Sequence, residues 1–299
     1  PEMGVAGEPA HSPLFPVELT EPELGAEHML INIGPQHPAT HGVLRLVCEL
    51  DGETVIKVTP HIGYLHSSFE KLGEYRTWNQ IVTLTDRMDY LAPLIYNCAY
   101  VMSVEKLMGI EVTEQCKVFR VILMEMERIF SHLLWLGTTA IDLGAFTPFL
   151  YAFQDREKIY TLHEKYTGAR ITTSATRVGG MMADIPDGWI DELKEFLLVF
   201  PRTLDEIDAL LTTNAIHLGR TQNVGVISAE DAVNCGFTGP NLRATGVDFD
   251  LRKDHPYCGY EKYDFEVPIG TTGDCYDRYL VRMEEVRQSI EIVRQIVDS

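Results

Sequence analysis

Two short segments near the N-terminus alternate between apolar and polar positions. The alternation covers residues 29–33 and 43–59, and a period of two is typical of β-strands with one buried face. An Asp-Gly pair at 51–52 divides the longer segment, which is a strong hairpin signal. We therefore expect a small antiparallel sheet, with residues 34–42 as the loop between its first two strands.

Helical spacing dominates from about residue 65 onward. Apolar residues recur every three or four positions over 86–108, 116–136 and 150–166, which predicts amphipathic helices packed as a bundle.

The helical period continues in the C-terminal half of the chain. It covers 189–211 and crosses Pro201, which we expect to kink or divide that element. Residues 219–273 are rich in Gly, Asp, Pro and Tyr and predict loops and short hairpins. A strongly amphipathic helix is expected to follow over 274–299.

One apolar stretch requires a test as a membrane span. From Ile129 to Phe153 the only strongly ionisable side chain is Asp142. Glycines and a proline interrupt the stretch, and an acidic residue near the middle of a lone span is costly. A buried helix-loop-helix is therefore favoured.

The patterns together predict an α+β fold that is mainly α, a helical bundle with a small N-terminal antiparallel β-sheet. There is no internal repeat, low-complexity tract or evident interdomain linker. We expect one domain over 29–299. The expected parts are an extended arm over 1–28, a β-rich front end over 29–60, a helical bundle over 61–218, a loop and hairpin region over 219–273 and a C-terminal helix over 274–299.

Composition excludes several classes of function. The 299 residues are 45% hydrophobic, enough for one large core or two smaller ones. Lys and Arg total 25 against 44 Asp and Glu, and a net charge of -19 argues against nucleic-acid binding and direct adhesion to anionic lipid. The six cysteines form no C-x-x-C motif, so neither a zinc ribbon nor an iron-sulfur motif is expected. Free thiols in a reducing compartment fit best.

The loop over 34–42 carries two candidate residues, His37 and His41. On a continuous helix this spacing would predict a zinc pair, but Pro38 and Gly42 indicate a loop. Two interpretations remain open at this point: a rigid turn whose histidines cap backbone groups, or a functional pair.

Several separated motifs carry a resemblance to one family. They are "GPQHPATHG" at 34–42, "PHIGYLHSSFEK" at 60–71, "TDRMDYL" at 85–91, "DLGAFTPF" at 142–149 and "LRATGVDFDLRKDHPY" at 242–257. From Met29 to Ser299 the chain resembles the quinone-site subunit of respiratory complex I, called the 49-kDa subunit. That family is related to the large subunit of nickel-iron hydrogenases, so the resemblance implies a hydrogenase large-subunit-like fold.

The resemblance implies a site where ubiquinone is reduced, beside the subunit that holds the terminal 4Fe-4S cluster. It places His41 and Tyr90 at the quinone carbonyl oxygens and makes Asp142 the partner that orients and charges His41. Quinone reduction takes two electrons and two protons, so hydrogen-bond donors beside the developing oxygen charge suit the chemistry. Three further residues are implied to contribute to binding: His37, Thr40 and Met88.

Two of these assignments have alternatives. From the residues alone, Asp142 could instead cap a helix or pair with a buried Arg, and in so apolar a stretch its pKa should be raised unless it is paired. His37 is expected to shape the loop rather than to donate a proton.

The resemblance also implies the setting of the chain. It would be a subunit of the proton-translocating NADH:ubiquinone reductase, active only in the assembled complex. The implied partners are the terminal iron-sulfur-cluster subunit, other peripheral-arm subunits and membrane-arm subunits, with no nucleic acid. The implied location is the matrix side of the mitochondrial inner membrane or, alternatively, the cytoplasmic face of a bacterial plasma membrane.

The chain departs from the family pattern at several places. No C-x-x-C stands near 85–90, so no bound metal is expected. Ser67 and Ser68 follow "LH", where many relatives carry an Arg that can be methylated. Thr172 and Thr173 stand where relatives place a histidine near the terminal cluster, which is expected to alter the pH dependence of the cluster potential.

Typical members also continue beyond the last helix with a segment that forms part of the cavity wall. The apolar stripe of that helix needs a cover. We therefore expect a separate polypeptide or a continuation of the chain to supply the segment.

Two other functions compete with quinone reduction. A degenerate hydrogenase-like scaffold could bind partner subunits without hosting quinone. A membrane-bound hydrogenase-type subunit could not hold nickel without metal-binding cysteines.

Overall fold

The computed structural model describes residues 28–299, which fall into two compact units. The first unit ends at His66, and the second runs from Ser67 to Ser299. The arm expected over 1–28 lies, apart from its last residue, outside the described residues. Each unit is described by itself.

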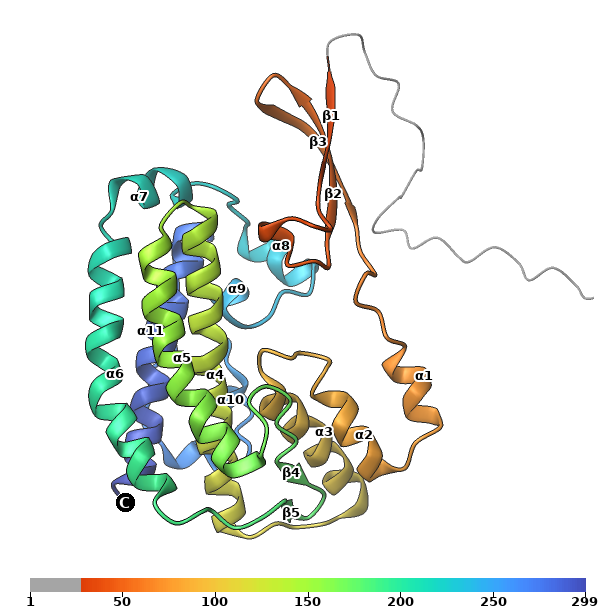
Figure 1. Cartoon of the computed structure of the whole chain (residues 1–299), viewed down its shortest axis with the longest axis vertical. Coiled ribbons are helices and arrows are strands. Elements are labelled where there is room, and N and C mark those ends of the chain that lie inside the picture. The colour runs from red at the N-terminus through yellow and green to blue at the C-terminus, as the bar shows by residue number, and fades with distance from the viewer. Residues whose placement is uncertain (1–27) are drawn as a thin grey trace, which may run out of the picture. The chain divides into compact units, whose positions relative to one another are not determined.

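The first unit is a three-stranded antiparallel sheet (Figure 1). Its strands β1 (Met29–Ile33), β2 (Arg45–Asp51) and β3 (Thr54–His61) follow one another in the sheet. A 3₁₀ turn, η1 (Pro38–Thr40), lies in the loop between β1 and β2. The hairpin predicted at 51–52 joins β2 to β3, and Gly52 supplies the positive φ of 58° that the turn requires. The predicted sheet is thus confirmed.

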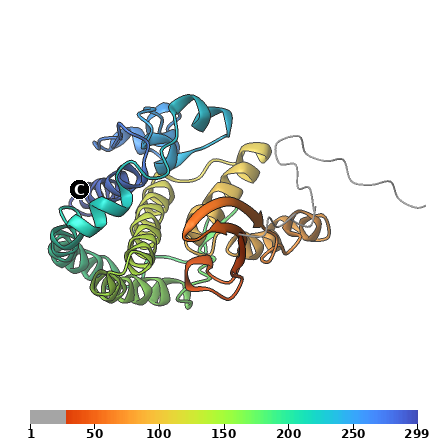
Figure 2. The same cartoon turned by 90° about the horizontal axis from the view of Figure 1, so that it is seen from above.

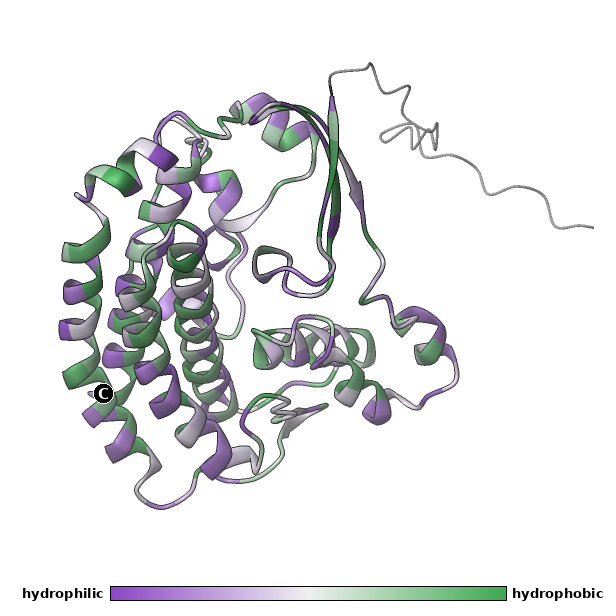
Figure 3. Cartoon of the chain, turned by 45° about the horizontal axis from the view of Figure 1, so that its top comes forward, coloured by the Kyte–Doolittle hydropathy of each residue, from purple (hydrophilic) through white to green (hydrophobic). Residues whose placement is uncertain are grey.

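Four long helices form the body of the second unit: α4 (Glu114–Asp142), α5 (Phe146–Thr167), α6 (Trp189–Leu211) and α11 (Cys275–Val297). Figures 1 and 2 show them side by side, with α4 packed against both α5 and α11. Hydrophilic and hydrophobic residues alternate around each of these helices (Figure 3). The mainly α fold follows from this amphipathic pattern.

Shorter elements complete the second unit. They are α1 (Phe69–Glu74), α2 (Trp78–Thr85), α3 (Pro93–Met108), β4 (Thr176–Arg177), β5 (Gly180–Met181), α7 (Ala215–Thr221), α8 (Ala229–Asn234), α9 (Gly239–Arg243), α10 (Leu251–Asp254) and η2 (Tyr260–Lys262).

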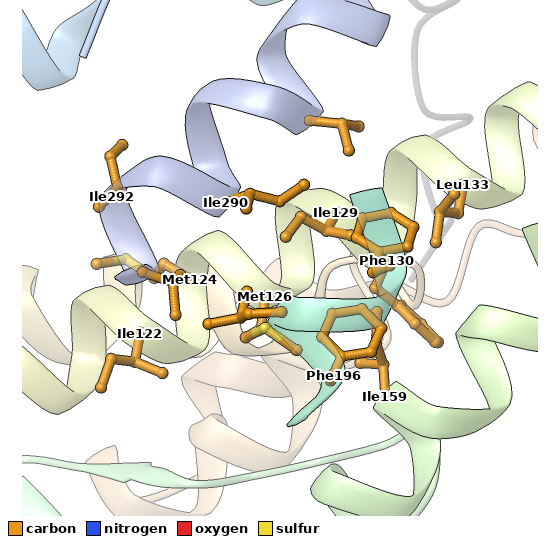
Figure 4. Packing of buried hydrophobic residues seen from close by; sticks show 14 of the residues in the cluster. Ile122, Met124, Met126, Ile129, Phe130, Leu133, Ile159, Phe196, Ile290 and Ile292 are labelled. Atoms are coloured by element: carbon orange, nitrogen blue, oxygen red, sulfur yellow. The ribbon is translucent and has the colours of Figure 1, made fainter. Parts of the chain in front are cut away.

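The core lies between the long helices (Figure 4). Ile129 and Leu133 of α4, Ile159 of α5 and Ile290 of α11 are 2% exposed or less. Each such side chain contributes roughly 1.5–3 kcal/mol through burial. The long helices therefore pack through the apolar faces that the three- and four-residue spacing predicted.

A buried ionic network connects α4 to α11. Glu125 accepts hydrogen bonds from Tyr260 Oη at 2.5 Å and Ser289 Oγ at 2.6 Å, and it forms ion pairs of 3.1 Å with Arg128 and Arg252. Burial alone would raise the pKa of Glu125, but the two guanidinium groups and the two hydroxyls outweigh it and hold the pKa at about 2. Glu125 is therefore a fixed carboxylate that links four segments of the unit.

Two details of the predicted elements are wrong. The helix expected from 86 begins instead at Pro93, because Ala92 before the proline has a non-helical backbone with φ -140° and ψ 51°. The region 219–273 contains short helices and no hairpin in its described backbone, whereas the small hairpin β4–β5 lies earlier. Of the two effects expected of Pro201, division of the helix does not occur, since α6 continues through the proline, and a kink stays a prediction.

The apolar stripe of α11 is already covered. Met283, Val286 and Ile290 are 3% exposed or less, and α11 packs against α4 and α6. The stripe therefore needs no cover from another polypeptide or from a continuation of the chain, and the expected segment itself stays a prediction. No helix within 28–299 combines the length and the apolar character that a membrane crossing needs.

Candidate functional site

The loop over 34–42 is shaped by its own side chains. His37 caps η1, accepting a hydrogen bond from the Ala39 N–H at its Nδ1, 3.2 Å away. Thr40 is 4% exposed, and its hydroxyl lies 3.1 Å from the Pro35 carbonyl and 3.0 Å from the His37 carbonyl. His37 thus shapes the loop, as expected, and Thr40 fixes it from inside.

Glycine is required at the start of this loop. Gly34 has φ of 87°, and a Cβ there would lie 2.1 Å from the Leu44 carbonyl oxygen. Gly42 also has a positive φ, of 78°, but open space around it. The backbone therefore turns back on itself at Gly34 at a distance that no side chain permits.

The His41 side chain is exposed and does not stabilise the loop. The residue stands at the C-cap of η1 in the left-handed region, with φ of 52°. No residue within 28–299 forms a hydrogen bond with its ring. Left-handed geometry is uncommon for a residue with a Cβ and is often found at functional sites. The capping role proposed for both histidines applies to His37 alone.

Tyr90 and Met88 lie in a second turn, over 86–92 between α2 and α3. Both are partly open, with 37% and 44% of their surface exposed. Asp86 holds the turn in place. Its carboxylate accepts hydrogen bonds from Asn97 Nδ2, 2.5 Å away, and from the Ser174 hydroxyl. The turn is therefore bonded directly to the distant segment that contains Ser174.

Asp86 combines burial with several donors. Burial raises its pKa, while the hydrogen bonds from Ser174 and Asn97 and the charges of Arg87 and Arg177 act in the opposite direction. Sequence reasoning missed Asp86, Asn97 and Ser174 as positioning residues. The only available signal was an acidic residue at the start of the helix predicted over 86–108.

Asp142 is the last residue of α4, and its side chain is exposed. It neither caps the helix nor pairs with an Arg among the described residues. The apolar environment expected around it is therefore not found within residues 28–299. Arg220, which the sequence did not indicate, donates a hydrogen bond of 2.7 Å to the Leu143 carbonyl at the same helix end, where a cation is favoured.

The structure groups the candidate residues into three places. One loop of the first unit carries His37, Thr40 and His41, a turn of the second unit carries Met88 and Tyr90, and Asp142 ends α4. The convergence of the three places on one quinone stays a prediction. Within 28–299, no three or more His, Cys, Asp and Glu side chains form a group that could hold a metal ion.

Comparison with known proteins identifies the family. A family model for the respiratory-chain NADH dehydrogenase 49-kDa subunit matches residues 142–299. The D-type subunit of the NADH-quinone oxidoreductase of Geotalea uraniireducens is 56% identical over 273 residues, which cover 91% of this chain and 70% of that protein. The corresponding protein of Methylacidiphilum infernorum is 56% identical over 269 residues, covering 90% and 64%. A D-type subunit of the same enzyme from a Roseiflexus species is 54% identical over 282 residues, covering 94% and 68%.

These matches define the chain as a subunit of a respiratory-chain NADH dehydrogenase. It belongs to the 49-kDa subunit family, and the resemblance found in the sequence is confirmed.

Proposed function

We propose that this chain, a core subunit of an NADH-quinone oxidoreductase, forms with the subunit holding the terminal 4Fe-4S cluster the site where ubiquinone accepts electrons and protons. Reduction there would be coupled to proton translocation. The observation that carries the proposal is the geometry of the loop over 34–42. In this chain, which belongs to the 49-kDa family, Gly34, His37 and Thr40 hold the loop in shape. The His41 ring is left free for a ligand.

The proposed chemistry divides among three residues. His41 and Tyr90 donate hydrogen bonds to the two quinone carbonyl oxygens, and these bonds strengthen as negative charge develops on the oxygens. Asp142 supplies a carboxylate that orients His41 and stabilises its protonated form. All three side chains are exposed in the isolated chain, so they are available to a ligand.

The remaining candidates have supporting roles. His37 and Thr40 hold the loop in place, and Met88 offers an adaptable apolar surface beside Tyr90. Electrons reach the quinone from the cluster of the neighbouring subunit, and no step requires a metal bound by this chain.

The proposed setting is the peripheral arm of complex I at a membrane surface. Its partners are the terminal iron-sulfur-cluster subunit, other peripheral-arm subunits and membrane-arm subunits, with a polypeptide segment completing the cavity wall. Because the relatives above are bacterial, the cytoplasmic face of a bacterial plasma membrane is favoured over the matrix side of the mitochondrial inner membrane.

The test is Tyr90→Phe in the assembled complex. The variant keeps the ring and removes one donor, so the apparent KM for a short-tail ubiquinone should rise about fivefold, the equivalent of roughly 1 kcal/mol for one neutral hydrogen bond. NADH oxidation with an artificial acceptor that takes electrons upstream should not change.

Tyr96→Phe is the matched control, because Tyr96 is similarly exposed, at 41%, on the neighbouring helix α3. An unchanged KM in Tyr90→Phe would remove Tyr90 from the site. Absence of quinone binding in the assembled native complex would instead support the scaffold function.

A further inference from the structure

A second acidic site lies inside the bundle, at Glu127 on α4. Its side chain is fully buried, with 0% exposure. Neither carboxyl oxygen has a hydrogen-bond partner among the described residues. Buried polar groups are almost always paired, so a fully buried carboxyl without a partner requires a physical explanation.

The groups around Glu127 are also buried and partly unpaired. His163 of α5 is 2% exposed, its Nε2 lies 3.8 Å from Glu127 Oε1, and this nitrogen has no hydrogen-bond partner in 28–299. The Leu94 N–H and the Thr173 hydroxyl approach the carboxyl without reaching hydrogen-bond geometry. Arg156 of α5 lies close by, with its guanidinium 3.8 Å from the centre of the Phe130 ring.

The charges that face the pair favour its neutral form. Burial raises the pKa of Glu127 well above its ordinary value, and the charge of Asp89 raises it further, whereas Leu94, Arg156 and Thr173 oppose this only in part. Burial and the charge of Arg156 lower the pKa of His163 to about 3. Both shifts favour a protonated Glu127 beside a neutral His163 imidazole, so the titratable proton of the site belongs to Glu127.

Glu125, two residues earlier on the same helix, shows the opposite arrangement. It is equally buried, but two guanidinium groups and two hydroxyls surround it and keep it ionised. Burial as such thus does not decide the state of a glutamate in this bundle. The number of donors around the carboxyl group decides whether a buried glutamate is ionised, and Glu127 lacks such donors.

We propose that Glu127 and His163 form a buried site that stores one exchangeable proton beside the turn carrying Tyr90. Asp89, whose charge acts on Glu127, precedes Tyr90 directly in the chain. At 3.8 Å the two side chains are too far apart for a hydrogen bond, so no such bond fixes the proton between them. The storage site stands on its own geometry, while its use in quinone reduction rests on the proposed function.

Electrons, protons and charge are all accounted for in the proposed step. Reduction of a quinone to a quinol consumes two electrons, delivered from NADH, and two protons. Glu127 releases one of these two protons toward the quinone side and becomes a carboxylate that faces the Arg156 guanidinium, while the second proton comes from solvent. A proton from solvent then restores the acid, so no net charge remains in the bundle after a turnover.

The first test is infrared spectroscopy of the assembled complex at neutral pH, in H₂O and in D₂O. We expect a carbonyl band of a protonated carboxylic acid that shifts in D₂O, disappears in Glu127→Gln and remains in Glu195→Gln, an exposed glutamate of α6. The band should change amplitude when NADH reduces the quinone. An unchanged carboxylic-acid region in Glu127→Gln would overturn the proposal.

A second variant covers the case in which Glu127→Gln does not assemble. His163→Gln keeps the acid and changes its neighbour, so the same band should shift in frequency. An unchanged band frequency in His163→Gln would show that the two residues do not form one site.

Kinetics separate this inference from the proposed function. In Glu127→Gln the KM for quinone should stay at the native value, while kcat falls severalfold as the pH is raised and protons become scarce. An unchanged KM in Tyr90→Phe would contradict the proposed quinone site and leave the buried proton site untouched. A native pH profile in Glu127→Gln would contradict the use of the stored proton alone.

Discussion

At the scale of single residues, the His41 loop depends on one glycine and one threonine. Gly34 allows the backbone to pass the Leu44 carbonyl at a distance that excludes a Cβ. Thr40 lies beneath the turn and bonds two carbonyls of the same loop. His41 is therefore held by its neighbours rather than by its own side chain, which leaves the imidazole free for chemistry.

Replacing Gly34 by Ala should be more damaging than replacing Gly42 by Ala. Both positions have a positive φ, which costs a residue with a Cβ about 1 kcal/mol. Gly34→Ala adds a clash with the backbone at 2.1 Å, so its total cost should exceed about 2 kcal/mol. Denaturant unfolding of the purified chain measures both, and equal losses in the two variants would refute the role of the clash.

At the scale of elements, the network around Glu125 joins helices that are far apart in the sequence. Its partners Arg252 and Ser289 lie 127 and 164 residues along the chain. Breaking a buried ion pair from one side leaves an unpaired charge, which typically costs about 3–5 kcal/mol. The bundle should therefore be most sensitive to substitution at this point.

The network also sets a pH dependence. The pKa of Glu125 is about 2 in the fold, below its ordinary value of 4.5. Its contribution to the free energy of unfolding, roughly 3 kcal/mol, is present above pH 4.5 and is lost as the pH falls toward 2. Unfolding free energies measured between these pH values should fall steeply in the native chain.

Two variants check the assignment to Glu125. Glu125→Gln should be destabilised at pH 7 and show a flatter acid profile, and Ser289→Ala should lose about 1 kcal/mol while folding normally. Glu195→Gln should resemble the native chain. Parallel acid profiles for the native chain and Glu125→Gln would show that other carboxyl groups control acid unfolding.

At the scale of the whole molecule, the chain combines a net charge of -19 with cysteines that are spread through the sequence. Cys48 and Cys98 are buried in different units, and Cys235 is exposed. Iron-sulfur clusters need four ligands brought together, and the spacing in this chain does not provide them. Under the proposed function, the electrons for the quinone come from the cluster of a partner subunit.

The purified chain should accordingly contain no stoichiometric iron or acid-labile sulfide. Metal analysis by mass spectrometry and a colorimetric sulfide assay measure both, with the assembled complex as the positive control. Iron and sulfide in near-stoichiometric amounts in the chain alone would contradict the proposed route of electrons.

The sequence by itself determined the elements whose signals are local. The Asp-Gly pair fixed the hairpin of β2 and β3, the three- and four-residue spacing fixed the long helices, and the loop residues around His37 indicated a turn rather than a helix. The family motifs named the candidate residues. These signals succeed because turn conformation and the direction of an apolar face depend on neighbouring residues in the chain.

Only the tertiary structure decided the state of individual polar groups. Glu125 and Glu127 stand two residues apart in one helix, yet the first is a carboxylate with four partners and the second a carboxyl group whose oxygens have no hydrogen-bond partner among the described residues. Asp142 belongs to an apolar stretch and is nevertheless exposed, because α4 ends there. Burial and hydrogen-bond partners come from segments distant in sequence, and they set the energy of a charge, so no local pattern could have predicted these states.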